Sequence, residues 1–272
     1  MVAIFGNSMN DNLIEASAEF LAQSRLGGKP TPSLPSDLVP STEAEGYAVQ
    51  MVLNQILQRS GYGTVIGHKI GCTTQIMQNF LKIDHPCAGE VFSSMVFDKR
   101  VELPLSKFHC VGVECEIAAR LGKNMTGERG PYTRESAGEA VAALMGAIEL
   151  VDDRYEQYSQ LSTPTLIADD FFNAGVVLGC EQTEWQHLDL TIMNGKLTIN
   201  GKDHASGMGA DILGLPFEAL SWLANHRAGI GKPLRRGDFV MLGSVVRTEW
   251  VTQPSSVRVS LEGLGTAEVT FT

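Results

Sequence analysis

Residues 111–117 constrain the fold most, because they alternate apolar side chains with two glutamates in the order Val-Gly-Val-Glu-Cys-Glu-Ile. Successive side chains of a β-strand point to opposite faces, so the pattern predicts a strand whose apolar face meets a core. Glu114 and Glu116 then project together from the other face. Two adjacent carboxylates repel each other unless positive charge lies between them, and hard divalent cations prefer oxygen ligands. A metal-binding strand and the solvated face of an edge strand are the two interpretations.

A second segment, Ala147–Asp153, favours the metal. It places Glu149 between Ile148 and Leu150 in a short apolar strand, where an unpaired charge is costly. An ion pair with Arg154 is the structural alternative. As a third ligand, Glu149 would complete an all-carboxylate site, which suits Mg²⁺ or Mn²⁺ better than zinc, because zinc prefers nitrogen and sulfur ligands.

A third unusual segment, Gly67–Thr74, contains Lys69 within a predicted strand. The lysine is followed by Gly71 and two threonines, which is not the pattern of a solvated strand face. Near a divalent cation the ammonium form is disfavoured and the lysine pKa falls, so the side chain becomes usable as an acid or base. An exposed lysine at a sheet edge is the alternative.

Composition narrows the class of protein. Of the 272 residues, 43% are hydrophobic and 19% are charged, which is typical of a soluble globular chain, and no apolar run is long enough to span a membrane. The net charge of −10 argues against binding to nucleic acid or to anionic membranes. Five cysteines without a C-x-x-C pair favour free thiols in a reducing compartment. Because residues 1–12 carry no secretory pattern, we expect a cytoplasmic protein.

The periodicity predicts a helical N-terminal segment, residues 1–62, packed on a mostly β main domain, residues 63–272. Helices are expected at 11–24, 41–59, 75–81, 133–145 and 217–227. Strands are expected at 65–72, 91–97, 111–121, 147–151, 176–179, 188–199, 239–244, 257–261 and 267–271. The Asn-Gly pairs at 194–195 and 200–201 indicate a hairpin turn and a strand end.

Six short motifs follow one another along the chain. They are Lys69–Thr73, Val113–Ala118, Ile148–Asp152, Ile167–Asp169, Leu220–Asn225 and Gly237–Ser244. In this order they resemble the 2-keto-4-pentenoate hydratases and the related 2-oxo-3-hexenedioate decarboxylases of the fumarylacetoacetase superfamily, over roughly Ser41 to the C-terminus. The resemblance implies an α+β fold, a mixed β-roll of the fumarylacetoacetase C-terminal type with an N-terminal helical extension. It also implies a homo-oligomer that acts on a small-molecule 2-oxo acid.

The resemblance further implies roles for individual residues. The metal ligands for Mg²⁺ or Mn²⁺ are expected to be Glu114, Glu116 and Glu149. The catalytic residues are expected to be Lys69 and, on the loop beside the site, Asp169. The residues that border the substrate are expected to be Lys69, Asn173 and Ser244.

Two departures from the family pattern stand near these residues. The family's A-D-N-A-S-S run reads Ala-Asp-Asp-Phe-Phe-Asn at 168–173, so its hydroxyls are replaced by Phe171 and Phe172. The stretch 245–250 also lacks the family's small, glycine-containing turn. These changes predict a reshaped pocket, although the two phenylalanines are equally consistent with a place in the core.

The implied activity is metal-dependent addition of water to a 2-hydroxy-2,4-dienoate or 2-oxo-3-enoate, giving a 4-hydroxy-2-oxo acid, as in the meta-cleavage catabolism of aromatic compounds. Loss of CO₂ from a 2-oxo-3-enedioate is the main alternative. A C–C hydrolase acting on acylpyruvates would need a His–Glu dyad, for which His85 and His109 are candidates. A non-catalytic relative that binds a metal–oxo-acid complex is a fourth reading. Candidates to meet a charged far end of the substrate are Arg247, Arg154 and His68.

Overall fold

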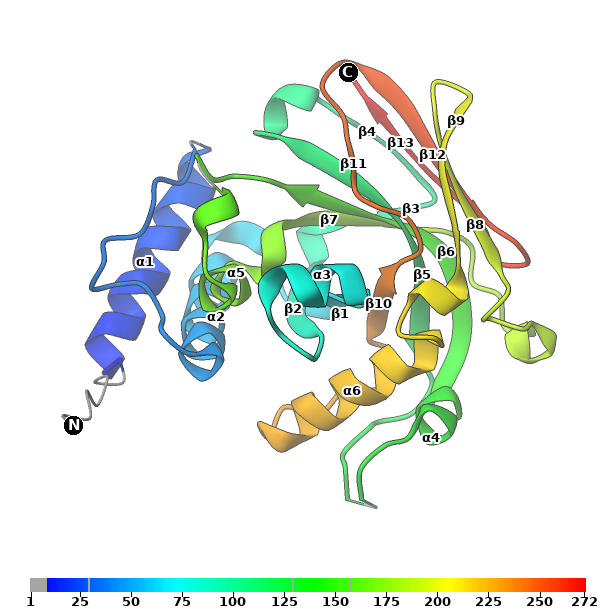
Figure 1. Cartoon of the computed structure of the whole chain (residues 1–272), viewed down its shortest axis with the longest axis horizontal. Coiled ribbons are helices and arrows are strands. Elements are labelled where there is room, and N and C mark those ends of the chain that lie inside the picture. The colour runs from blue at the N-terminus through cyan, green and yellow to red at the C-terminus, as the bar shows by residue number, and fades with distance from the viewer. Residues whose placement is uncertain (1–8, 29, 129, 157) are drawn as a thin grey trace.

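The computed structural model describes residues 9–28, 30–128, 130–156 and 158–272. The prediction that residues 1–12 carry no secretory pattern includes residues 1–8, which lie outside the described residues. Two β-sheets and six α-helices make up most of the described chain (Figure 1).

The larger sheet is mixed and carries the segments singled out in the sequence. Its hydrogen-bonded order is β2 (Cys87–Phe92), β1 (Val65–Gly71), β10 (Phe239–Ser244), β5 (Val111–Leu121), β6 (Val141–Asp152), β7 (Asn173–Leu178) and β3 (Val96–Asp98), and β11 (Glu249–Trp250) also pairs with β5. The β1–β10 and β3–β7 pairs are parallel, whereas the other pairs are antiparallel.

The second sheet covers one face of the first. Its order is β4 (Arg100–Leu103), β13 (Gly265–Phe271), β12 (Ser255–Leu261), β8 (Asn194–Ile199) and β9 (Lys202–Met208). Along β12 every second side chain is buried, as expected for a strand with one face on a core. These side chains and the odd-numbered residues of β5, such as Val113 and Ile117, belong to one hydrophobic core between the sheets. The even-numbered residues of β5 therefore face the opposite side.

The helices are α1 (Asp11–Gly27), α2 (Glu43–Leu57), α3 (Gln75–Leu81), α4 (Arg134–Gly138), α5 (Thr163–Ala168) and α6 (Pro216–Gly229). Figure 1 shows α1, α2 and α5 together on one side of the larger sheet, far from the second sheet. Thr42 and Glu45 form a capping box at the start of α2. Leu21 of α1 and Leu53 of α2 belong to a separate small core that joins these helices. No helix in the described ranges has both the length and the apolarity needed to cross a bilayer.

Local pattern misassigned one element near the site. The helix predicted over 133–145 forms only over α4 and is wrong beyond it, because α4 ends at Gly138 and β6 already begins at Val141. The apolar residues at 137, 141, 144 and 145 fit a helical face, but pairing with β5 overrides that spacing. Almost all residues of β6 are buried, on both sides of the sheet, so the run 141–148 is apolar and carries no period of two.

The strand predicted over 188–199 forms only over β8, Asn194–Ile199. Asn194–Gly195 lies inside that strand, whereas Asn200–Gly201, with φ of 50° and 75°, forms the turn of the β8–β9 hairpin. The strand predicted at 91–97 is interrupted by a helical turn at Ser93–Met95. The sequence prediction missed β9, whose mostly exposed polar residues give no alternating apolar signal, and the short β4 and α5.

Candidate metal centre

The three predicted glutamates meet on one face of the β5–β6 pair. In this antiparallel register Glu114 lies directly opposite Glu149, and Glu116 lies two residues further along β5. One carboxylate oxygen of each residue lies within 4.8 Å of the others. Within the described part of the chain, this is the one group of three or more acidic, histidine or cysteine side chains close enough to share a metal ion.

The cluster is buried, and its pKa values reflect that. Glu116 and Glu149 are each 1% exposed, and Glu114 is partly exposed. Burial and the neighbouring Glu149 raise the pKa of Glu114. Burial, followed by Glu149 and Glu114, raises the pKa of Glu116 well above its usual value. The site therefore disfavours three ionised carboxylates unless positive charge is added.

Lys69 supplies one such charge. Its Nζ lies 2.7 Å from Oε1 of Glu149 and donates a hydrogen bond to the carbonyl oxygen of Phe171 at 3.2 Å. Burial by itself lowers the lysine pKa, but Glu149, Glu114 and Glu116 together outweigh it and raise the pKa above its usual value. This direction is opposite to the lowered pKa expected next to a cation, because among these side chains one ammonium faces three carboxylates.

Neighbouring groups orient the carboxylates. The amide of Gly243 donates to Oε2 of Glu116 at 3.1 Å, and Nδ2 of Asn173 donates to Oε1 of Glu149 at 2.9 Å. The hydroxyl of Thr248 donates to Oε1 of Glu114. One oxygen of each carboxylate is thus held by a donor, and each carboxylate retains a second oxygen as a possible cation ligand.

Gly243 and Thr248 were not identified as functional residues from the sequence. A side chain at Gly243, where φ is +123°, would start 2.3 Å from Oγ1 of Thr73, so glycine is required for its amide to reach Glu116. Gly89 is needed in a similar way, since a Cβ there would lie 2.8 Å from Cγ of Lys69. For Thr248 the sequence does contain an indication, because the residue lies in the stretch 245–250, which departs from the family pattern.

The donor set fits a hard divalent cation. It consists of oxygen atoms alone, held in place by hydrogen bonds, in a buried region with more negative than positive charge. Mg²⁺ and Mn²⁺ prefer such ligands, whereas zinc prefers nitrogen and sulfur. Cys115, between the two glutamates of β5, points to the opposite face and does not join the set.

Asp169 lies in a different set of ion pairs. Its carboxylate contacts Arg154 at 2.7 Å and Arg25 at 3.5 Å, and all three side chains are almost fully buried. The alternative prediction, an ion pair between Glu149 and Arg154, is wrong, because Arg154 pairs with Asp169 and Glu149 pairs with Lys69. The catalytic role assigned to Asp169 stays a prediction.

The other predicted substrate-site residues lie beside the cluster. Asn173 contacts Glu149, as described above, and the backbone of Ser244 lies opposite Glu116 in the β10–β5 pair. The Ser244 hydroxyl donates to the carbonyl oxygens of Val246, at 2.8 Å, and Cys115, at 3.2 Å. The structure therefore places Ser244 at the site with its hydroxyl already engaged by backbone.

Phe171 and Phe172 occupy core positions. Phe171 packs in a small buried cluster with Cys72, Cys87 and residues of α5. The ring of Phe172 meets Tyr155 and Tyr158 edge-on, at centroid distances of 5.7 Å. The carbonyl oxygen of Phe171 accepts a hydrogen bond from Lys69, and that of Phe172 accepts one from the buried Arg154.

The remaining candidates are dispersed. His85 forms a His–Glu pair with Glu43 at 3.2 Å and stacks on Trp222, away from the contacts of the glutamate cluster. His109 is exposed, and His68 faces Asp238 at 3.6 Å. Exposed Arg247 directly precedes Thr248, the residue that holds Glu114. Of the three residues suggested for a distal carboxylate, Arg247 is the one that is exposed.

The turn after α5 is strained. Asp170, Phe171 and Phe172 have φ values of 51°, 46° and 64°, and each left-handed non-glycine residue costs roughly 1–2 kcal/mol. Asp170 is fully buried, and burial raises its pKa to about 6 despite nearby Arg25. The Glu90 amide and the Asn54 side chain donate to its Oδ1, at 3.1 and 3.4 Å.

We expect Asp170→Asn to stabilise the protein at neutral pH. Unfolded Asp170 loses its proton near pH 3.8, whereas the folded protein keeps it to about pH 6, so stability falls as the pH rises through that window and stays lower above it. The variant should gain about 3 kcal/mol over wild type at pH 7.5 and little at pH 3.5. Urea unfolding at both pH values measures this, and an equal gain at both would contradict the assignment.

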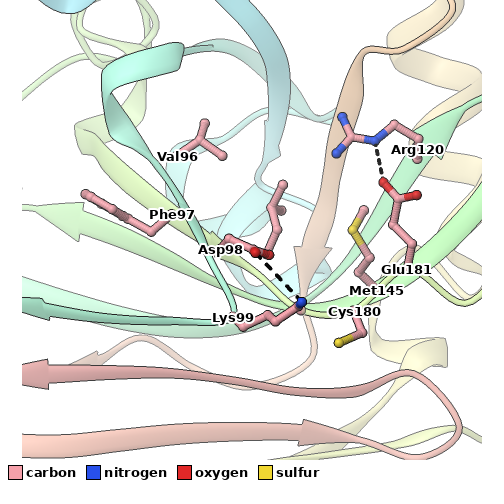
Figure 2. A pocket seen from close by; sticks show the side chains of 10 residues that line it. Val96, Phe97, Asp98, Lys99, Arg120, Met145, Cys180 and Glu181 are labelled. Atoms are coloured by element: carbon pink, nitrogen blue, oxygen red, sulfur yellow. Dashed lines mark hydrogen bonds and ion pairs between the residues drawn. The ribbon is translucent and has the colours of Figure 1, made fainter.

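A pocket elsewhere on the larger sheet holds none of the predicted site residues. It has a volume of about 450 Å³ and is lined by residues of β3, β5, β6 and the segment after β7 (Figure 2). Its charged side chains pair within the pocket, Arg120 with Glu181 at 2.8 Å and Lys99 with Asp98 at 3.8 Å. The glutamate cluster is therefore the better candidate for chemistry.

No family model matches this chain, but its sequence and its fold are both similar to those of known proteins. The 2-keto-4-pentenoate hydratase of Burkholderia vietnamiensis is 32% identical over 264 residues, which cover 97% of this chain and 99% of the relative. The 4-oxalocrotonate decarboxylase from Pseudomonas putida G7, solved with magnesium and adipate, superposes with a TM-score of 0.90 at 21% identity, over 98% of this chain and 100% of that one. The fumarylpyruvate hydrolase from Pseudomonas aeruginosa, solved with Mn²⁺ and pyruvate, gives a TM-score of 0.59 at 15% identity, over 75% and 88%.

The likeness to the decarboxylase structure, which covers 98% of this chain, confirms the predicted α+β fold with mixed sheets and N-terminal helices. Both solved structures, that of the decarboxylase and that of the hydrolase, contain a divalent metal ion. The sequence relation carries the assignment further, because it extends over almost the whole of both chains. The chain therefore belongs to the 2-keto-4-pentenoate hydratase family of hydro-lyases.

Proposed function

We propose that the protein is a hydratase that depends on Mg²⁺ or Mn²⁺ and adds water to a 2-hydroxy-2,4-dienoate in the meta-cleavage catabolism of aromatic compounds. The product is a 4-hydroxy-2-oxo acid. The observation that carries the proposal is the convergence of Glu114, Glu116 and Glu149 in a chain 32% identical to a 2-keto-4-pentenoate hydratase. One relative is a 2-keto-4-pentenoate hydratase and another is a 2-hydroxyhexa-2,4-dienoate hydratase, so the proposal covers substrates of five and of six carbons.

The three glutamates would hold the cation. Such a cation, when bound, supplies Lewis-acid stabilisation of the negative charge that develops on a 2-oxo acid as protons move. The carboxylates themselves are kept in place by the amide of Gly243 and by the side chains of Asn173 and Thr248. This pre-arrangement means that little reorganisation is needed when the ligand arrives.

Lys69 is the residue proposed to move a proton. Its ammonium donates to Glu149 and to the Phe171 carbonyl, and it is 4% exposed, so bulk water does not compete for it. Hydration of a 2-hydroxy-2,4-dienoate moves the 2-hydroxyl proton to C5, and water then adds its hydroxyl group to C4 and its proton to C3. The Nζ atom can hold the travelling proton between these positions, and general acid–base catalysis of this kind contributes about 10²- to 10⁴-fold.

The test is a turnover assay with defined metal content. The purified protein is treated with EDTA and assayed with 2-hydroxypenta-2,4-dienoate before and after addition of Mg²⁺ or Mn²⁺. We expect loss of the dienoate absorbance, and formation of a 4-hydroxy-2-oxo acid by mass spectrometry, only when the metal is restored. Full activity in EDTA, or none on any dienoate with metal present, would refute the proposal.

The same assay separates the alternatives. CO₂ release from a 2-oxo-3-enedioate, without hydration of the dienoate, would identify a decarboxylase. Cleavage of an acylpyruvate would identify a C–C hydrolase and draw attention to His85 and Glu43, the His–Glu pair of the structure. Binding of a 2-oxo acid without deuterium exchange at its C3 position would identify a non-catalytic relative. The proposed homo-oligomer and cytoplasmic location stay predictions.

A further inference from the structure

The segment Asp169–Asn173 connects the glutamate cluster to the N-terminal helices. Its central three residues are left-handed in succession, a conformation that single non-glycine residues visit and that runs of them do not hold unaided. The surrounding structure must therefore impose this conformation. We call this segment the site turn.

The site turn makes two contacts with the cluster. The carbonyl of Phe171 accepts the hydrogen bond from Lys69 at 3.2 Å, and the side chain of Asn173 donates to Glu149 at 2.9 Å. Both contacts depend on the path of the backbone, because a different φ at 170–172 would redirect the carbonyl and displace the asparagine. The position of Lys69 relative to Glu149 is thus set in part by the turn.

Two guanidinium groups hold the turn. Arg154, just after β6, contacts the Asp169 carboxylate at 2.7 Å and the carbonyls of Phe172 and Asn173 at 3.2 and 3.3 Å. Arg25 approaches from the other side. Its Nη2 donates to the Asn173 carbonyl at 3.0 Å, and its Nη1 lies 3.5 Å from Asp169 and 3.5 Å from Asp170.

Arg25 belongs to the last turn of α1 and lies 145 residues before Asp170 of the site turn in sequence. Its side chain is 3% exposed, which is unusual for an arginine near a helix end and requires paired partners. α1 is itself fixed, because Ser17 donates to the Leu38 carbonyl at 2.7 Å and Leu21 is buried against the α2 core. The guanidinium is therefore presented from a rigid element.

We propose that Arg25 is a positioning residue for the reaction: by binding Asp169, Asp170 and the Asn173 carbonyl, it holds the site turn in the conformation that places Lys69 and Glu149. The N-terminal helix thereby completes the site from outside the β domain. The kinetic part of this inference rests on the proposed hydratase function, whereas the structural part does not.

The test compares Arg25→Gln with Arg25→Lys and with Val259→Ala. Val259 is buried in β12 of the second sheet, so its truncation destabilises the protein without touching the turn. The first readout is hydrogen–deuterium exchange of two backbone amides of the site turn. The amide of Phe172 donates a hydrogen bond to the carbonyl oxygen of Asp169, and the amide of Asn173 donates one to that of Asp170. We expect these amides to exchange faster in Arg25→Gln, and at the wild-type rate in Val259→Ala.

The second readout is the split between kcat and KM in the presence of saturating Mg²⁺. Misplacement by about 1 Å can cost about 10²-fold in rate, so we expect kcat of Arg25→Gln to fall about 10- to 100-fold, with a much smaller change in KM. Lysine keeps the positive charge but not the several N–H donors of the guanidinium group, so the kcat of Arg25→Lys should lie between those of wild type and Arg25→Gln. Arg25 also lines a cavity of about 470 Å³, and added guanidinium should therefore partly restore kcat to Arg25→Ala.

Unchanged amide exchange in Arg25→Gln, together with kcat within threefold of wild type, would overturn the inference. An equal loss of kcat in Val259→Ala would also overturn it, because general destabilisation would then explain the effect. A third outcome separates the two proposals. If the site-turn amides exchange faster in Arg25→Gln but the wild-type protein hydrates no dienoate, the positioning role is supported and the proposed function is refuted.

Discussion

Replacing Glu116 with glutamine abolishes metal-dependent turnover and, in the metal-free protein, increases stability. The first effect is expected because glutamine removes one of three anionic ligands, leaving Glu114 and Glu149 to bind the cation. The second effect is expected because Glu116 is buried beside two like charges that raise its pKa well above its usual value. A neutral side chain of the same shape removes that repulsion while keeping an oxygen that accepts the Gly243 amide.

Thermal and urea unfolding with and without Mg²⁺ measure both effects. At 100 times its dissociation constant, a ligand that binds only the folded state stabilises it by about 2.7 kcal/mol, and this increment should disappear in Glu116→Gln. Glu102→Gln serves as the matched control, because Glu102 is an exposed carboxylate on β4 of the second sheet. Wild-type activity in Glu116→Gln, or an undiminished response of its stability to Mg²⁺, would contradict the proposal that Glu116 binds a catalytic metal ion.

Replacing Lys69 with methionine should have the complementary effect. Methionine fills similar space but supplies no proton, so we expect kcat to fall about 10²- to 10⁴-fold while Mg²⁺ still stabilises the folded protein. Without metal, the variant should be less stable than wild type, because Glu149 loses its partner at 2.7 Å and removal of one member of a buried ion pair typically costs about 3–5 kcal/mol.

Deuterium exchange at C3 of a 2-oxo acid, followed by nuclear magnetic resonance in D₂O with Mg²⁺, isolates the proton-transfer step. Wild type should exchange this position, Lys69→Met should bind the metal without exchanging it, and Glu116→Gln should fail in both respects. Lys202→Met, an exposed substitution on β9, is the control. Wild-type exchange in Lys69→Met would transfer the acid–base role to another group, of which Asp169 is the first to examine.

The two variants are informative together because one ammonium is shared among three carboxylates. Removing a carboxylate relieves the excess negative charge, and removing the ammonium increases it. The stability of the metal-free protein should therefore move in opposite directions in Glu116→Gln and Lys69→Met. The response of stability to Mg²⁺ should separate the variants in the same experiment, since only the glutamate is expected to bind the cation.

The sequence alone was enough to find the cluster, because side-chain direction in a strand has a period of two. Glu114 and Glu116 must share a face of β5 whatever the strand pairs with, and the flanking apolar residues show which face meets the core. Helical spacing of apolar residues is an equally local signal, and α1, α3 and α6 begin within a residue of their predicted starts. The division of the chain at residue 62 stays a prediction.

Tertiary structure decided how the charges pair. Glu149 has an arginine five residues away in sequence, but the β5–β6 and β6–β7 registers direct it toward Lys69 and Asn173, and Arg154 turns instead to Asp169. The extension of β6 back to Val141 was also decided by pairing with β5, against a helical pattern of apolar residues. The burial of Arg25 against the site turn has no local signal at all, because it depends on where α1 packs. Local periodicity thus fixed which side chains share a face, whereas contacts between distant segments determined which charge each of them meets.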